Sequence, residues 1–182
     1  MPILGGLIEV LDSAIWDRVP VTDSLHTDFF VEAQISRPEK DQFTTNCYKP
    51  GVLDAPQRFT IEAVRLSFLR DGEPLPLNHP LWWNSLVKIN IATRPWVEAP
   101  SHMLVDPMWL AAASVSAWKD LFIGDRITLL RRGNYVLESR ITIEQMEPFH
   151  ARLELSGIAR HHVPKNCEAF LILDGLRERG VI

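Results

Sequence analysis

The segment from Phe59 to Gly72 constrains the fold of this chain more than any other. Apolar residues alternate with polar ones at Phe59, Ile61 and Ala63, and the alternation resumes on the opposite parity at Val64, Leu66 and Phe68. A period of two predicts a β-strand. The change of parity predicts either a β-bulge or a strand buried on both faces, and both occur in two-sheet β proteins. Asp71-Gly72, suited to positive φ, ends the strand.

Other segments also have the period and length of short strands. They are residues 29–36, 86–92, 149–157 and the apolar run 168–173, with a further edge strand at 43–48. In the second of these, Val87, Ile89 and Ile91 share one face, which we expect to be the core face. Gly133-Asn134 predicts a hairpin turn within 127–143, although a helix there stays open. Strands do not alternate with helices, so the sequence predicts an all-β, antiparallel two-sheet jelly roll or β-sandwich.

One helix is expected to decorate this β scaffold. Asp106 is suited to an N-cap and Pro107 to the first helical position, where its missing N–H is not needed. The alanine-rich run that follows, to Trp118, has apolar residues at helical spacing. The sequence therefore predicts a helix over 106–118.

Residues 1–28 are expected to form an N-terminal arm or short helix, and 29–182 a single domain. Leu7, Val10, Leu11, Ala14 and Ile15 have nearly helical spacing, but a β arm fits them almost as well. Such an arm either grasps a partner or packs on its own domain. Its acidic residues weaken a membrane-facing role, because anionic lipid favours basic faces.

Charge and cysteine content exclude several classes of protein. The net charge of −4 argues against a coat that binds nucleic acid through a basic surface, so no sequence-specific nucleic-acid contact is expected. Cys47 and Cys167 have no finger or CxxC spacing, and we expect two buried thiols. No apolar run reaches the roughly 20 residues that span a bilayer. The N-terminal sequence lacks the pattern of a signal peptide, which favours expression inside a cell.

The sequence offers little for catalysis, and we expect no enzyme, no cofactor and no metal. His161 and His162 are adjacent and on a strand would point to opposite faces, so they could not share one ion. The other histidines are scattered, at 26, 79, 102 and 150. No nucleophile elbow or phosphate loop is present. The carboxylate pairs Glu144 with Glu147 and Glu62 with Asp71 are better explained as solvated residues than as an acid and base.

Tryptophans in connecting segments suggest contacts instead. Trp82-Trp83 follows His79-Pro80, and Trp96 lies in the proline-bounded TRPWVEAP, so both sites are predicted to be loops. Large rings in loops anchor neighbouring subunits or carry sugar rings, unless they fold under their own domain. The candidate subunit contacts are Trp16, Trp82, Trp83, Trp96, Arg177 and Arg179.

Several stretches of the sequence resemble capsid proteins of tailless icosahedral phages. They are PGVLDAPQRFTIEAVRLSFLRDGEPLP, SLVKINIATRPWVEAP, EPFHARLELSG and FLILDGLRERGVI. The type in question is the upright single jelly-roll coat protein of membrane-containing, sphaerolipovirus-like phages. The resemblance covers 46–182 in strand order and strand-flanking residues, without an invariant signature. It implies a structural protein without an active site, which forms capsomers with a second capsid protein above an internal viral membrane.

Three hypotheses follow. The first is a bacteriophage capsid protein that self-associates or co-assembles into an icosahedral shell, is assembled in the host cytoplasm and resides in the virion. The second is a carbohydrate-binding or adhesion jelly roll, which predicts an exposed tryptophan in a groove. The third is a cupin-like metal enzyme, which predicts at least three converging His or Glu side chains.

Overall fold

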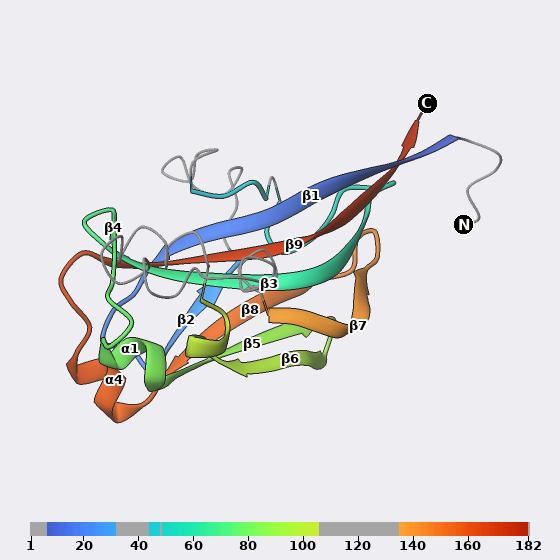
Figure 1. Cartoon of the computed structure of the whole chain (residues 1–182). Coiled ribbons are helices and arrows are strands. Elements are labelled where there is room, and N and C mark those ends of the chain that lie inside the picture. The colour runs from blue at the N-terminus through green and yellow to red at the C-terminus, as the bar shows by residue number, and fades with distance from the viewer. Residues whose placement is uncertain (1–6, 32–43, 48, 106–134, 182) are drawn as a thin grey trace, which may run out of the picture.

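The chain folds into two antiparallel β-sheets that pack face to face (Figure 1). This computed structural model describes residues 7–31, 44–47, 49–105 and 135–181. The long sheet contains β1 (Leu7–Pro20), β9 (Cys167–Val181), β3 (Arg58–Arg70), β4 (Glu73–Pro74) and β7 (Tyr135–Ile143). The short sheet contains β2 (His26–Phe29), β8 (Phe149–Leu155), β5 (Ser85–Ile91) and β6 (Arg94–Pro100).

The strand pairing is that of a jelly roll. Apart from the two-residue β4, the described strands pair from the outside of the chain inward: β1 with β9, β2 with β8, β3 with β7, and β5 with β6. Such nested pairing is a long antiparallel hairpin folded over into two sheets, the jelly-roll arrangement. The predicted all-β, two-sheet antiparallel fold is confirmed.

Both explanations of the parity change in β3 are correct. Its pairing with β7 and with β9 shifts register between Ile61 and Ala63, which marks a β-bulge. Beyond the bulge, Leu66 and Phe68 join the core, while the alternating Ser67 and Leu69 are also buried. The second half of the strand is therefore covered on both faces. Asp71 and Gly72 have positive φ, as the turn prediction requires.

The N-terminal segment is a strand, so the helix alternative for residues 1–28 is wrong and the β alternative is right. β1 pairs with β9 along its whole length. Ile15 and Val19 contribute to the core on one face of this pair. The apolar spacing resembled a helix because exposed residues such as Val10 and Leu11 lie on both faces of the strand.

Some predicted boundaries are corrected or lie outside the described residues. A strand was expected at 29–36, but β2 ends at Phe29 and Phe30 has a φ of 63°, while residues 32–36 lie outside the described residues. The edge strand expected at 43–48 is reduced to an isolated bridge between Thr45 and Asp17. The decorating helix predicted at 106–118 and the turn at Gly133-Asn134 fall outside the described residues.

Short helical elements gather at one end of the sandwich (Figure 1). They are α1 (Pro80–Trp83), the 3-10 turn η1 (Ser101–Met103) and α4 (Gly157–His161). The first and last residues of the described chain lie together at the other end, where β1 and β9 project from the body. None of the helices in the described ranges is long and apolar enough to cross a membrane.

Candidate interaction surface

Helix α1 turns one of two consecutive tryptophans into the core and the other toward solvent. His79 caps the helix, its Nδ1 accepting from the Leu81 N–H at 3.3 Å, and Pro80 occupies the first turn. Trp82 is only 3% exposed and packs edge-on against Phe68, with ring centroids 4.7 Å apart. Trp83 is 60% exposed. The loop prediction is wrong here, and Trp82 is a core residue rather than a contact residue.

The exposed Trp83 ring is held in one position. It stacks on the His102 imidazole with ring centroids 4.6 Å apart and an interplanar angle of 19°. Its Nε1–H donates to the Leu77 carbonyl at 2.8 Å. A fixed ring loses less conformational entropy on binding than a mobile one. Trp83 therefore has the features of a preorganised anchor.

Further exposed apolar side chains lie on the elements at the same end of the sandwich. Among the described residues, large exposed hydrophobic side chains at this end are Leu25, Leu77, Trp83, Met103 and Ile158. We call these five residues the apolar end. A contiguous exposed apolar patch on a soluble protein typically marks a contact site.

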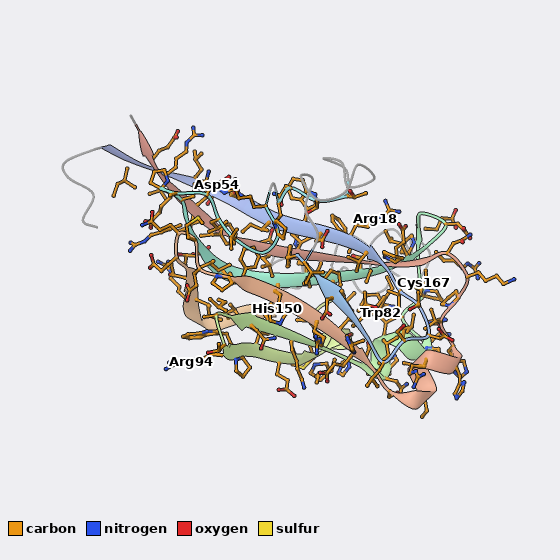
Figure 2. All side chains as sticks on the ribbon, turned by 180° about the vertical axis from the view of Figure 1, so that it is seen from behind. Arg18, Asp54, Trp82, Arg94, His150 and Cys167 are labelled. Carbon is orange, nitrogen blue, oxygen red and sulfur yellow. The ribbon has the colours of Figure 1, made fainter. Side chains whose placement is uncertain are left out.

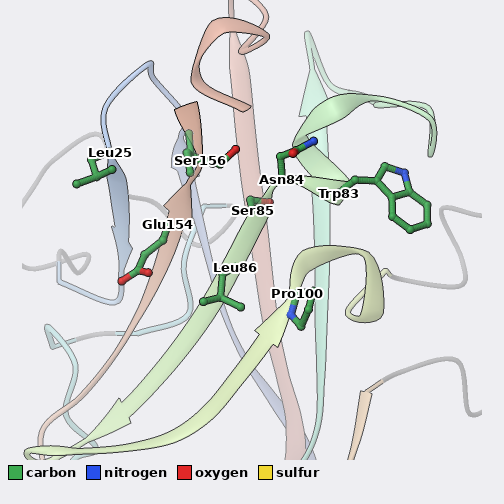
Figure 3. Close-up of a pocket in the computed structure, with 9 residues that line it drawn as sticks. Leu25, Trp83, Asn84, Ser85, Leu86, Pro100, Glu154 and Ser156 are labelled. Carbon is green, nitrogen blue, oxygen red and sulfur yellow. The ribbon is translucent and has the colours of Figure 1, made fainter. Parts of the chain in front are cut away.

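A groove opens beside the apolar end (Figure 3). It encloses about 510 Å³ and is lined by residues from β5, β6, β8 and α1. Leu25 and Glu154 lie on one side and Pro100 on the other, with Leu86 between them. The Trp83 ring borders the groove and points away from Glu154. The lining thus combines apolar side chains with the polar Asn84, Ser156 and Glu154.

Beyond the groove, the outer face of the short sheet carries paired charges. Asp28, Arg152, Lys88 and Glu98 stand side by side across the four strands. Arg152 binds Asp28 at 2.6 Å, and this hydrogen bond raises the arginine pKa. Lys88 lies 3.0 Å from Glu154, whose hydrogen bond raises the lysine pKa. These partly exposed pairs favour a solvated face, so they delimit the apolar end.

The other predicted contact residues do not join Trp83 in one site. Trp96 is not in a loop; it lies on the edge strand β6 and is 52% exposed. Figure 2 shows Trp82, the neighbour of Trp83, and Arg94, which begins β6, toward opposite ends of the sandwich. Trp16 is half-buried in β1, opposite Ile172.

The two arginines lie on the projecting half of β9. Arg179 pairs with Glu9 across the strands, and Arg177 stands opposite Leu11. Arg177 also lines a small cavity of about 130 Å³ with Asn46 and Asp54. Both side chains therefore belong to the β1–β9 ribbon, far along the sheet from α1.

The histidines and carboxylates considered for catalysis are dispersed. Within the described ranges, no group of three or more His, Cys, Asp or Glu side chains could hold a metal ion. His161 ends α4 and His162 caps it, so they are not on a strand. Glu144 binds Arg58 at 2.7 Å, and Glu62 lies 3.5 Å from Arg140.

Sequence reasoning missed which tryptophan of the pair is exposed and missed the apolar neighbours of that ring. The Pro80 helix start was the available signal, because consecutive residues of a helix face different directions. In the comparisons with known proteins, no family model matches this chain and no curated protein matches it.

Proposed function

We propose that this chain is a structural subunit of a bacteriophage capsid, and that the apolar end is one of its subunit contacts. Jelly rolls of this kind serve as viral coat proteins, lectins and cupins. The observation that carries the proposal is the exposed Trp83 ring of the apolar end, which His102 and Leu77 hold in place. Within this function, a second capsid protein and the internal membrane of the virion are further partners.

The physical case rests on what the apolar end would gain by association. Trp83, Met103 and Ile158 expose apolar surface whose burial is favourable by about 25 cal/mol per Å². Tryptophan is among the residues that most often dominate the binding energy of interfaces. The ring is already fixed by His102 and Leu77, so little ordering cost opposes the contact.

The test is the solution mass of the purified protein over a concentration series, measured by light scattering. Trp83→Ala should weaken self-association by about 2 kcal/mol, or roughly thirtyfold in dissociation constant. Trp96→Ala is the matched control, because it removes a tryptophan of similar exposure from a different element, the edge strand β6. Trp82→Ala is unsuitable, since emptying a buried tryptophan site costs about 3–5 kcal/mol of stability.

Electron microscopy of the associated protein adds the shape of the product. Closed shells or capsomer-like rings that Trp83→Ala dissolves would support a coat protein. The proposal would be overturned if the wild-type chain stayed monomeric at every concentration, or if Trp83→Ala left its association unchanged.

A carbohydrate-binding module is the second candidate, favoured by the groove beside Trp83. Its polar lining, Asn84, Ser156 and Glu154, supplies the hydrogen-bonding groups that sugar hydroxyls need next to an aromatic ring. Calorimetric titration of the monomer with a panel of oligosaccharides distinguishes the two candidates. Saturable binding that Trp83→Ala abolishes would favour the module over the capsid subunit.

A further inference from the structure

The described residues pair with the outer edge of β1 over only half the length of that strand. Arg18 N–H donates to the Thr44 carbonyl at 2.7 Å, and Asn46 N–H donates to the Trp16 carbonyl at 3.3 Å. The Asn46 side chain donates to the Ala14 carbonyl at 2.7 Å. These contacts show that even-numbered residues of β1 turn their backbone groups away from β9. Among the described residues, pairing along that edge ends at Ala14.

Toward the N-terminus, no residue in the described ranges pairs with this edge, and we call residues 7–14 the open half of β1. Ile8, Val10 and Asp12 present their N–H and C=O groups outward, and none of the described residues pairs with them on that side. Ile8 is 53% exposed and Val10 is 54% exposed. Native edge strands are commonly protected by proline, charged side chains or a bulge. The edge strand β6 has Pro95 and Pro100, whereas residues 7–14 of β1 have neither a proline nor a bulge, and their only charged side chains are Glu9 and Asp12.

We propose that a second copy of this chain pairs with the open edge, β1 against β1, antiparallel about a two-fold axis at Val10. The inference deepens the proposed function, because it rests on self-association and names a second contact. Each Val10 would exchange two hydrogen bonds with the partner's Val10. Ile8 would stand opposite the partner's Asp12, so the long sheets of the two copies become one.

Charge and hydrogen bonding select this register. Because only even-numbered residues of β1 turn their N–H and C=O groups outward, each must stand opposite an even-numbered residue of the partner. A pairing centred on Glu9 or on Asp12 would oppose two carboxylates directly, which is destabilising. A pairing centred on Leu11 would bring Ile8 against Ala14, whose carbonyl already accepts from Asn46.

The Val10 register avoids these conflicts. It makes six N–H···O bonds from three residues of each copy and covers the exposed Ile8 and Val10 side chains. Asp12 would stand opposite the partner's Ile8, four residues along the strand from the partner's Asp12, so the two Asp12 residues would lie roughly 14 Å apart. That exceeds the screening length of about 8 Å at physiological ionic strength. Glu9 is already paired with Arg179 in each copy.

Cysteine cross-linking tests both the partner and the register. In the proposed pair the two Val10 Cα atoms lie about 5.5 Å apart, within the range that a disulfide spans. Val10→Cys should therefore form a disulfide-linked dimer under mild oxidation. Ile8→Cys, with its two copies roughly 14 Å apart, should not. Cys47 and Cys167 are buried, so the introduced thiol is the exposed one. Equal cross-linking of both variants, or of neither, would overturn the pairing.

Val10→Pro removes one outward N–H and leaves the bonds between β1 and β9 in place. We expect it to abolish the β1 contact, while Val10→Thr, which keeps the N–H, retains it. Unfolding curves establish that both variants fold. If association survives Val10→Pro but still depends on Trp83, the edge pairing is wrong and the proposed function stands. If association is lost in Val10→Pro but is unchanged in Trp83→Ala, the edge pairing stands and the proposed contact at the apolar end is wrong.

Discussion

His79 stabilises the start of α1, the helix that carries Trp83, through one unprotonated ring nitrogen. Its Nδ1 accepts the Leu81 N–H that begins α1, and a protonated imidazole cannot accept that bond. Burial lowers the pKa of His79, and the nearby His162 and Arg70 lower it further. The unfolded chain therefore takes up this proton more readily than the folded chain.

The pH dependence of stability follows from that difference. The stabilisation that neutral His79 adds to the free energy of unfolding is fully present above a pH of about 6.5, the usual pKa of histidine. It is lost as the pH falls below that value. We expect the free energy of unfolding to decrease between pH 7.5 and pH 5. His79→Asn should reduce that decrease, because asparagine caps the helix without titrating. An unchanged slope in the variant would show that other groups carry the effect.

Cys167 begins β9 and is expected to be chemically inert in the folded protein. Burial, with a smaller contribution from Glu168, raises the pKa of its thiol to about 12. The thiolate is the reactive form, so almost none exists at pH 8. A thiol reagent at that pH should label Cys167 only after denaturant is added, as mass spectrometry of the labelled peptide would show. Rapid labelling of the native protein would contradict the buried position.

At the scale of elements, β9 depends on a glycine where it passes the bulge of β3. A Cβ at Gly175 would stand 1.9 Å from the Thr60 carbonyl oxygen, which is backbone and cannot move aside cheaply. Gly175→Ala should therefore destabilise the protein by about 1–3 kcal/mol. Gly157→Ala, in α4, meets no atom within 4 Å and should change stability by less than about 0.5 kcal/mol. Urea unfolding of the two variants compares them directly, and equal stabilities would contradict the close approach.

The elements that the sequence predicted well are those with one buried face. In β5, the residues Val87, Ile89 and Ile91 are all buried, as their period of two predicted. β8 was predicted in the same way, with Leu153 and Leu155 inward. Here the local pattern and the tertiary packing agree, so the sequence alone carries the information.

The elements that the sequence misplaced depend on distant partners. β1 is a strand because it pairs with β9, whose residues lie some 160 positions away, and no local pattern contains that pairing. Likewise, only the burial of Trp82 against Phe68 decides which ring of the tryptophan pair reaches the surface. The candidate contacts were thus the right kind of residue, but the sequence could not sort Trp82 from Trp83.

At the scale of the whole molecule, two separate groups account for most of the large exposed apolar residues in the described ranges. The apolar end lies beside α1, whereas Ile8, Val10 and Leu11 lie on the ribbon of β1 and β9 that projects at the other end (Figure 1). Contacts that share no residues and lie far apart contribute almost additively. The two proposed interfaces should therefore act independently of each other.

This independence gives an ordered series of particle sizes. With both interfaces intact, each copy contacts neighbours at both ends, and the wild-type chain should form large assemblies. Trp83→Ala should leave dimers joined through β1, and Val10→Pro should leave only the species joined through the apolar end. The double variant should be monomeric. Sedimentation velocity at one protein concentration measures all four. A monomeric single variant would mean that the two contacts depend on each other, because removing one interface should not abolish the other.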